Sequence, residues 1–183
     1  LWKSKLNYSL YCVNGPRIKD GTEEPEEAGM LSFENATDNN NNKAFGGRLG
    51  LLPFTNSSLE IGASAYYAMP GSDISPFEGD TLNEDLNYKD VTALLIAYDL
   101  SYVKTINPLK SIIDIKGQYN LSSISNATYF NPEDTSRYIF SNNSSSYYVQ
   151  LAFRPAMVDN SIIKKIELVG RYSVYNTPEG SLW

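Results

Sequence analysis

The stretch from Val91 to Leu121 reads VTALLIAYDLSYVK, then TINPL, then KSIIDIKGQYNL, and it decides the fold. Apolar and polar side chains alternate along both arms. The apolar series comprises Leu94, Ile96, Tyr98, Leu100, Tyr102, Ile113, Ile115, Tyr119 and Leu121. A period of two indicates β-strands with one apolar and one polar face. The arms meet at Asn107-Pro108, and together they predict a long antiparallel β-hairpin.

The length of this hairpin points to a membrane. Strands of globular proteins usually stop at about 5–6 residues. A strand of about 12 residues, at ~3.3 Å per residue and a tilt of roughly 40°, spans the apolar layer of an outer membrane. We therefore expect the hairpin to cross a bilayer.

Composition agrees with a β-rich membrane protein. The chain has 183 residues, of which 14 are tyrosines, and its net charge is −6. No apolar run approaches the roughly 18 residues that a transmembrane helix needs, which is compatible with a barrel because half of each strand faces a polar lumen. The negative charge argues against a nucleic-acid partner and against simple adsorption to anionic lipid.

Several kinds of chemistry are excluded by residues that the sequence lacks. Cys12 is the only cysteine, so neither an internal disulfide nor a zinc ribbon is possible. The sequence has no histidine, which removes Ser-His-Asp and Cys-His catalysis and the commonest zinc sites. We predict no enzymatic activity, no metal site and no cofactor. Leu1 does not begin a signal peptide, so we expect either a cleaved leader or a section of a longer protein.

Long and short connections alternate along the chain. The predicted strands are Lys5–Val13, Ala44–Leu52, Ser58–Met69, the two arms of the central hairpin, Ser146–Met157 and Ile162–Tyr175. Outer-membrane barrels have short periplasmic turns and long external loops, whereas soluble β-sandwiches, the alternative, have shorter strands. Bacterial barrels have even strand numbers. The seven strands counted here therefore predict a single domain over residues 1–183 that is part of a larger antiparallel transmembrane β-barrel.

Short motifs at strand ends and turns are spread along nearly the whole chain: Asn14-Gly15-Pro16, Gly46-Gly47-Arg48 through Pro53-Phe54, Ser58–Gly62, Asp99–Tyr102, Tyr147–Gln150 with Arg154-Pro155, Glu167–Tyr172 and Pro178–Trp183. Together these motifs resemble the phosphate-selective porin O and porin P family of Gram-negative outer membranes. The resemblance implies a barrel of about 16 strands around a water-filled channel, of which this chain is a section. Members of that family select anions with lumenal arginines and lysine clusters, but those residues do not match one by one here.

Alternation defines the residues expected to face the lumen. They are Arg48, Glu60, Asp99, Lys116, Gln118, Gln150, Arg154, Lys165, Glu167 and Arg171, with Lys5 in the first strand. Their basic excess would attract anions in a narrow aqueous path. Equally, opposite charges paired across strands would simply stabilise the wall: Asp99 opposite Lys116, Arg48 diagonal to Glu60, and Arg154 near Lys165 and Glu167. Fewer acids remain beside Arg171 and Lys165, which makes these two the better selectivity candidates.

Tyrosines form a further pattern near the strand ends. The set is Tyr66, Tyr67, Tyr98, Tyr102, Tyr119, Tyr147, Tyr148, Tyr172 and Tyr175. It predicts an aromatic girdle at the membrane interface, and the alternative is the core of a sandwich.

The sequence thus predicts an outer-membrane porin for passive diffusion of small polar or anionic solutes, with phosphate as a candidate. Its partners would be outer-membrane lipid and, if it forms an oligomer, further copies in a homotrimer or other outer-membrane proteins. The rival hypothesis is a non-conducting barrel that acts as a structural or docking component of an outer-membrane complex. Loop 14–43 is the first candidate for a segment that folds inward to narrow the pore.

Overall fold

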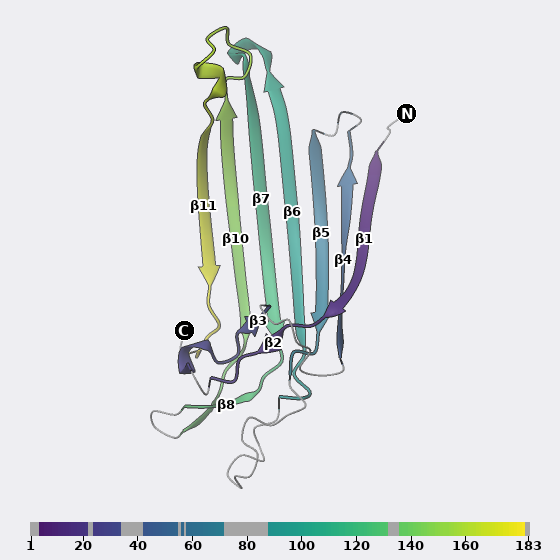
Figure 1. Cartoon of the computed structure of the whole chain (residues 1–183), viewed down its shortest axis with the longest axis vertical. Helices are drawn as coiled ribbons and strands as arrows, with labels where there is room; N and C mark the ends of the chain where they lie inside the picture. Colours follow the sequence, from purple (N-terminus) through teal and green to yellow (C-terminus); the bar gives the residue numbers. More distant parts are fainter. Residues whose placement is uncertain are drawn as a thin grey trace.

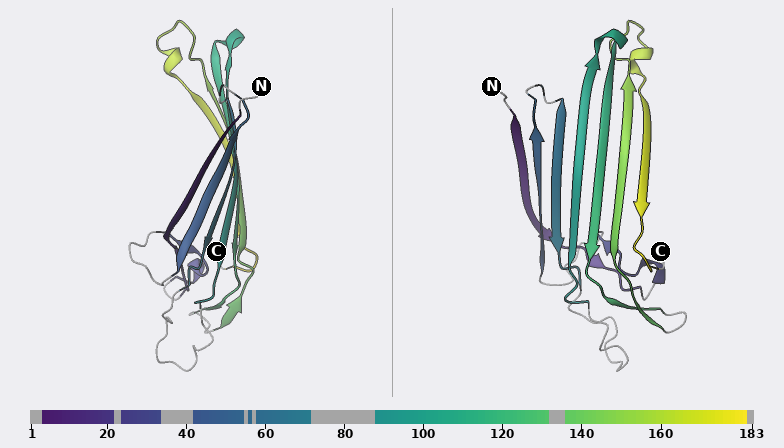
Figure 2. Two further views of the ribbon diagram at one scale, coloured as in Figure 1. Left: turned by 90° about the vertical axis from the view of Figure 1, so that its right-hand side faces the viewer. Right: turned by 180° about the vertical axis from the view of Figure 1, so that it is seen from behind.

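The computed structural model describes residues 4–21, 24–33, 42–54, 56, 58–71, 88–131 and 136–181. Its main element is one antiparallel sheet in which neighbours in sequence are neighbours in space (Figure 1). The strands, in their order across the sheet, are β1 (Lys5–Asn14), β4 (Lys43–Leu52), β5 (Leu59–Ala68), β6 (Ala93–Ile106), β7 (Ser111–Ile124), β10 (Asn143–Arg154) and β11 (Leu168–Asn176). The predicted all-β, antiparallel class is confirmed. The sheet is twisted and open, with β1 and β11 as its edges (Figure 2).

The last hairpin differs from the sequence prediction. We expected a strand over Ile162–Tyr175, but β11 begins only at Leu168, and a 3₁₀ helix, η3, covers Ile163–Lys165. Asn160 explains the difference, because its side-chain Oδ1 accepts hydrogen bonds from the backbone N–H groups of Ile162 (2.9 Å) and Ile163 (3.2 Å). Such local bonds compete with strand pairing. Lys165 and Glu167 therefore lie outside the sheet.

Cross-strand register sorts the side chains onto two faces, because directly paired residues point to the same side of a sheet. One face, which we call the apolar face, carries large side chains that are exposed. They are Leu6, Tyr8, Leu10, Phe45, Leu49, Leu51, Ile61, Tyr67, Leu94, Tyr98, Leu100, Tyr119, Leu121, Tyr147, Val149, Leu151, Leu168 and Tyr172. The opposite face, the polar face, carries most of the charged and amide side chains of the strands. The predicted two-faced pattern is confirmed.

The buried core lies at one end of the sheet, where the long connections pack together (Figure 1). We define the cap as the described residues of 15–33, 88–92 and 125–142. It contains η1 (Pro25–Glu27) and two small hairpins, β2 (Arg17–Ile18) with β3 (Leu31–Ser32) and β8 (Thr128–Phe130) with β9 (Arg137–Ile139). The sequence predicts loops over these segments. In the described ranges, no helix has the length and apolarity needed to cross a membrane.

Aromatic rings hold the cap together. Tyr129 is fully buried, and its ring centroid lies 5.2 Å from that of Phe140 and 5.7 Å from that of Tyr88. Burial raises the pKa of the Tyr129 hydroxyl to about 12 and raises that of Tyr88 as well, so both rings stay neutral. The cap is thus a small hydrophobic core built from segments far apart in the sequence.

The cap covers the polar face at this end. Ala44, Ala68 and Ala93, which the register places on the polar face, are fully buried. The 15–33 segment reaches across the sheet: Ile18 N–H donates to the Pro70 carbonyl (3.1 Å), and Asn142 Nδ2 donates to the Gly29 carbonyl (2.8 Å). The described part of the longest predicted loop therefore lies against the end of the polar face.

Candidate functional site

Most of the predicted lumen residues that lie on strands gather on the polar face in neighbouring rows. A row is a set of residues directly opposite one another on adjacent strands. One row contains Glu60, Ser101, Lys116, Gln150 and Arg171. The adjacent row contains Asp99, Gln118 and Tyr148, and Arg48 lies one row further toward the cap. We call Arg48, Glu60, Asp99, Lys116, Gln118, Gln150 and Arg171 the charged band.

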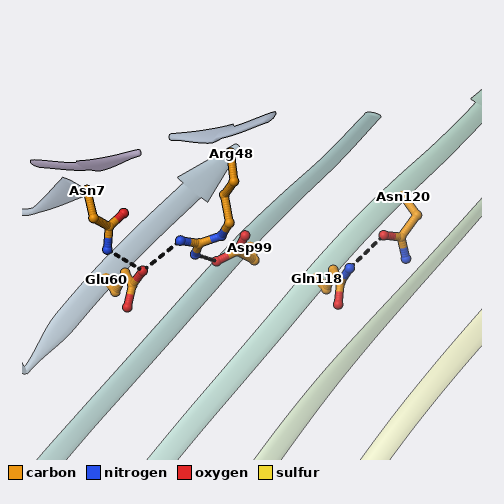
Figure 3. Close-up of polar contacts among 6 residues, drawn as sticks. All are labelled: Asn7, Arg48, Glu60, Asp99, Gln118 and Asn120. Carbon is orange, nitrogen blue, oxygen red and sulfur yellow. Dashed lines mark hydrogen bonds and ion pairs between the residues drawn. The ribbon is translucent and has the colours of Figure 1, made fainter. Parts of the chain in front are cut away.

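Arg48 lies at the centre of an ion-pair network (Figure 3). Its Nη1 lies 2.9 Å from Glu60 Oε1, and its Nη2 lies 2.6 Å from Asp99 Oδ2. Asn7 Nδ2 donates to the same Glu60 oxygen at 3.3 Å. One guanidinium thus faces two carboxylates, and the formal charge of this group of residues is negative. The predicted Arg48–Glu60 pair is confirmed, and it favours the wall-stabilising interpretation for these residues.

Two strand glycines make room for the Arg48 side chain. Gly50 and Gly62 stand in the Asp99 row, under the guanidinium. A Cβ added at Gly50 would come within 2.9 Å of Arg48 Nη1, and one at Gly62 within 2.5 Å of Nη2. Glycine inside a strand often marks such a close approach. That signal was present in the sequence, but it did not reveal which side chain would use the space.

Lys116 does not have the partner that the sequence predicted. Asp99 lies opposite Gln118, and Lys116 lies opposite Ser101 and pairs with Asp114 on its own strand at 3.2 Å. The prediction assumed a two-residue turn at Asn107-Pro108. Instead, the last pair is Ile106 with Ser111, because η2 (Asn107–Leu109) and Lys110 in a left-handed conformation (φ 47°) lengthen the turn. The register therefore shifts by two residues.

Arg171 and Arg154 are the arginines of the polar face that are free of carboxylates. In the part of the chain that the structure describes, neither forms an ion pair. The Arg171 guanidinium stacks over the Tyr148 ring, 3.9 Å from its centroid. Arg154 lies opposite Ile112, near the short-turn end of β10. Arg171 thus stays a candidate for selectivity, held in place by a cation–π contact.

Lys165 and Glu167 must be removed from the set of wall residues. Lys165 ends η3, and Glu167 precedes β11, so neither belongs to a strand. The β10–β11 pairing ends at Phe153 with Leu168, before either could lie opposite Arg154. Their predicted place in the wall, and the predicted grouping with Arg154, are wrong.

The structure contradicts the predicted tyrosine girdle at three of its positions. Tyr66, Tyr148 and Tyr175 lie on the polar face, where they cannot belong to a girdle on the apolar face. On the apolar face, Tyr98, Tyr119 and Tyr147 form one continuous row across β6, β7 and β10, within the strands and not at their ends. The sequence identified the tyrosines but not the face to which each points.

Neutral residues fill the polar face between the charged band and the cap. Gln118 Nε2 donates to Asn120 Oδ1 (2.8 Å), and Asn120 Nδ2 donates to Ser146 Oγ (3.0 Å) (Figure 3 shows the first bond). Beyond them lie Ser122 and Ser144, with Tyr66 in the same row. The polar face is therefore divided into a charged band and a neutral band.

No protein-family model, no curated protein and no solved structure matches this chain. The resemblance to the porin O and porin P family stays a prediction from the sequence motifs. The function must be argued from the two faces of the sheet.

Proposed function

We propose that this chain forms part of the wall of a transmembrane β-barrel in a Gram-negative outer membrane. Small polar or anionic solutes would diffuse through the lumen of this barrel. One observation carries the proposal: the sheet exposes large apolar side chains on one face and charged and amide side chains on the other. A wall between lipid and water needs these two faces. Contiguous exposed apolar surface of this kind is unusual in soluble monomers.

The dimensions of the strands support a membrane crossing. β6 and β7 each contain 14 residues, and β4 and β5 contain 10. At ~3.3 Å per residue, and with a tilt of about 40°, even the shorter strands reach roughly 25 Å, the height of the apolar band of outer-membrane barrels. Charged residues on the apolar face, Lys43 and Lys104, lie toward the strand ends.

Closure into a barrel requires partners for the two edges. β1 and β11 each pair on one side only, and nearly all of their residues are exposed. The β6–β7 hairpin also extends beyond β5, since Val103–Ile106 pair with β7 alone among named strands. A stagger between neighbouring hairpins is a requirement of barrel closure. We propose that further strands pair with both edges, in a barrel of about 16 strands as the family resemblance implies.

The test is single-channel current of the full-length protein in a planar bilayer under a salt gradient. A steady conductance with an anion-selective reversal potential is expected. Arg171→Ala should shift that potential toward zero, because Arg171 is a cation of the band that has no carboxylate partner in the described part of the chain. Added phosphate should reduce the current if phosphate is a solute. A protein that stays in aqueous buffer without detergent and never enters lipid would refute the proposal.

A non-conducting barrel that serves as a docking component is the second candidate, and the cap favours it. The cap buries the polar-face residues Ala44, Ala68 and Ala93 at the loop end. A cap that also closed the lumen would leave a folded barrel without conductance. Copurification of a stoichiometric outer-membrane protein, together with no current, would select this function over the channel.

A further inference from the structure

A cavity of about 400 Å³ lies on the polar face, in the neutral band. Its floor combines small side chains from the central strands, among them Ser64, Ala97 and Ser122, with the larger apolar side chain of Leu95. Tyr11 and Tyr66 form its wall on the β1 side, and Tyr175 forms the wall on the β11 side. The volume is in the range of small-molecule sites, roughly 300–1,000 Å³.

The tyrosines form a platform of rings. The Tyr11 and Tyr66 centroids lie 6.3 Å apart with their planes 29° from parallel, and Phe33 from the cap adds a third ring 6.2 Å from Tyr66. Tyr11 and Tyr66 both lie opposite Gly46, one from each neighbouring strand. A Cβ at Gly46 would collide with the Tyr11 ring, so the glycine permits this stacking across β4. Tyr11 and Phe33 remain substantially exposed, and the Tyr11 side chain lines the cavity.

Hydroxyl and amide groups surround the platform. In the described part of the chain, the hydroxyls of Ser64, Ser122 and Ser144 form no hydrogen bond, so they are available as donors and acceptors. Asn120, also at the cavity, is already bonded to Gln118 and Ser146. The described lining thus combines aromatic faces with small polar groups.

The charge of the site argues against an anion. None of the lining side chains is ionisable at neutral pH. The nearest charged group, Arg48, is neutralised by Glu60 and Asp99, so the adjoining part of the band carries more negative than positive charge. Arg171, which has no carboxylate partner in the described part of the chain, lies two rows away from Ser146, a residue that lines the cavity. An anionic ligand is therefore disfavoured, and the uncharged lining suits a neutral one.

We propose that the cavity is a binding site for a neutral sugar of one or two rings. The C–H face of a pyranose ring packs on an aromatic ring, and its hydroxyls exchange hydrogen bonds with serine hydroxyls and amides, which are the two kinds of group that line this cavity. The inference extends the proposed function, because in a conducting barrel the site would select neutral sugars before they reach the charged band.

Binding is measured first, without any need for conductance. Saturation-transfer NMR on the full-length protein in detergent would use cellobiose, a neutral disaccharide, and cellobionate, which carries a carboxylate. Cellobiose should bind, and Tyr66→Ala should weaken binding about tenfold through the loss of the central ring. The matched control is Tyr147→Ala, which removes a tyrosine from the apolar face of β10 and should leave cellobiose affinity unchanged.

The same variants are then tested in planar bilayers. Cellobiose should reduce the ion current of the wild type and of Tyr147→Ala at concentrations that leave Tyr66→Ala unaffected. Cellobiose binding without any ion current would uphold the sugar site and refute the channel. Three results would overturn the sugar site: no cellobiose binding, tighter binding of cellobionate than of cellobiose, or equal cellobiose affinity of Tyr66→Ala and the wild type. If an ion current is still observed, the channel hypothesis is unaffected.

Discussion

Large apolar side chains are buried in the cap but exposed on one face of the sheet. In the cap, Tyr129 and Phe140 are almost completely buried against each other. In the sheet, Leu10, Tyr98 and Leu100 stay exposed, although the strands that carry them are far longer. The cap is therefore stabilised by burial within this chain. The apolar face of the sheet has no apolar layer packed on it in the described part of the chain, and the proposed function places lipid there.

The largest expected effect tests whether the cap is a core of its own. Phe140→Ala should destabilise the cap by about 3–5 kcal/mol, the usual cost of removing a buried phenyl ring. Hydrogen exchange should then accelerate at β8 and β9 while the amides of β6 and β7 keep their protection. Equal loss of protection in the sheet would show that the two regions form one cooperative unit.

The same variant sharpens the choice between a channel and a docking barrel. If the cap limits the lumen, Phe140→Ala should raise the single-channel conductance, since the loosened cap no longer holds its place against Ala93 and Ile124. An unchanged conductance would mean that the cap lies beside the path and does not restrict it.

The next effect tests the environment of the apolar face. Leu100→Arg, in the middle of β6, should cost about 2–4 kcal/mol if this face contacts the centre of a bilayer. The measurement is a urea titration of the protein folded in lipid. Its control is Ser101→Arg, one residue further along on the polar face. On a water-exposed face, Leu100→Arg would stay within about 0.5 kcal/mol of the wild type, which would contradict a membrane wall.

A smaller effect tests the space under Arg48. Gly62→Ala should displace the guanidinium from Asp99, because the added methyl group occupies its place. The expected cost is about 1–3 kcal/mol, typical of overpacking. Gly170→Ala is the matched control, since a Cβ there meets nothing within 4 Å. Equal stability of the two variants would show that Arg48 moves aside without loss.

The smallest effect is a pH dependence of the cap. Lys19 Nζ donates to Glu27 Oε2 and holds the pKa of Glu27 below its ordinary value. A lowered folded-state pKa stabilises the fold above the unfolded pKa, about 4.3, and this contribution is lost as the pH falls through the lower folded value. As the pH falls below the unfolded pKa, the stability of the cap should therefore decline slightly more in the wild type than in Glu27→Gln. Hydrogen exchange at the cap amides measures this decline. Parallel declines would refute the contribution of this pair.

Much of the sheet could be predicted from the sequence, because successive side chains of a strand point to opposite faces, so alternating polar and apolar residues identify both the strand and its faces. Residues from Ile113 to Leu121 alternate so regularly that both the strand and the face of each side chain followed without tertiary information. From Leu94 to Leu100 one face is apolar throughout, but the other carries Leu95 and Ala97 before Asp99. The residues predicted for the lumen lie on the polar face wherever the strand assignment was correct. The strand assignment failed at Lys165 and Glu167, because the side-chain amide of Asn160 binds the backbone N–H groups at the start of this segment.

Register and the cap depended on tertiary structure. The turn at Asn107-Pro108 is two residues longer than its sequence suggests, and this changes every cross-strand partner in the hairpin, so Lys116 faces Ser101 in place of Asp99. The ion pairs of Arg48 join β4, β5 and β6, and the Tyr11–Tyr66 stack joins β1 and β5 across β4. Both lie over glycines whose role is visible only once neighbouring strands are aligned. The cap core joins Ala28, Tyr88 and Tyr129 across long polar connections that show no periodicity. The sequence by itself determined where most of the long strands lie and, where polar and apolar residues alternate, which way their side chains face, since that information is local; what they contact across the sheet was decided by the tertiary fold.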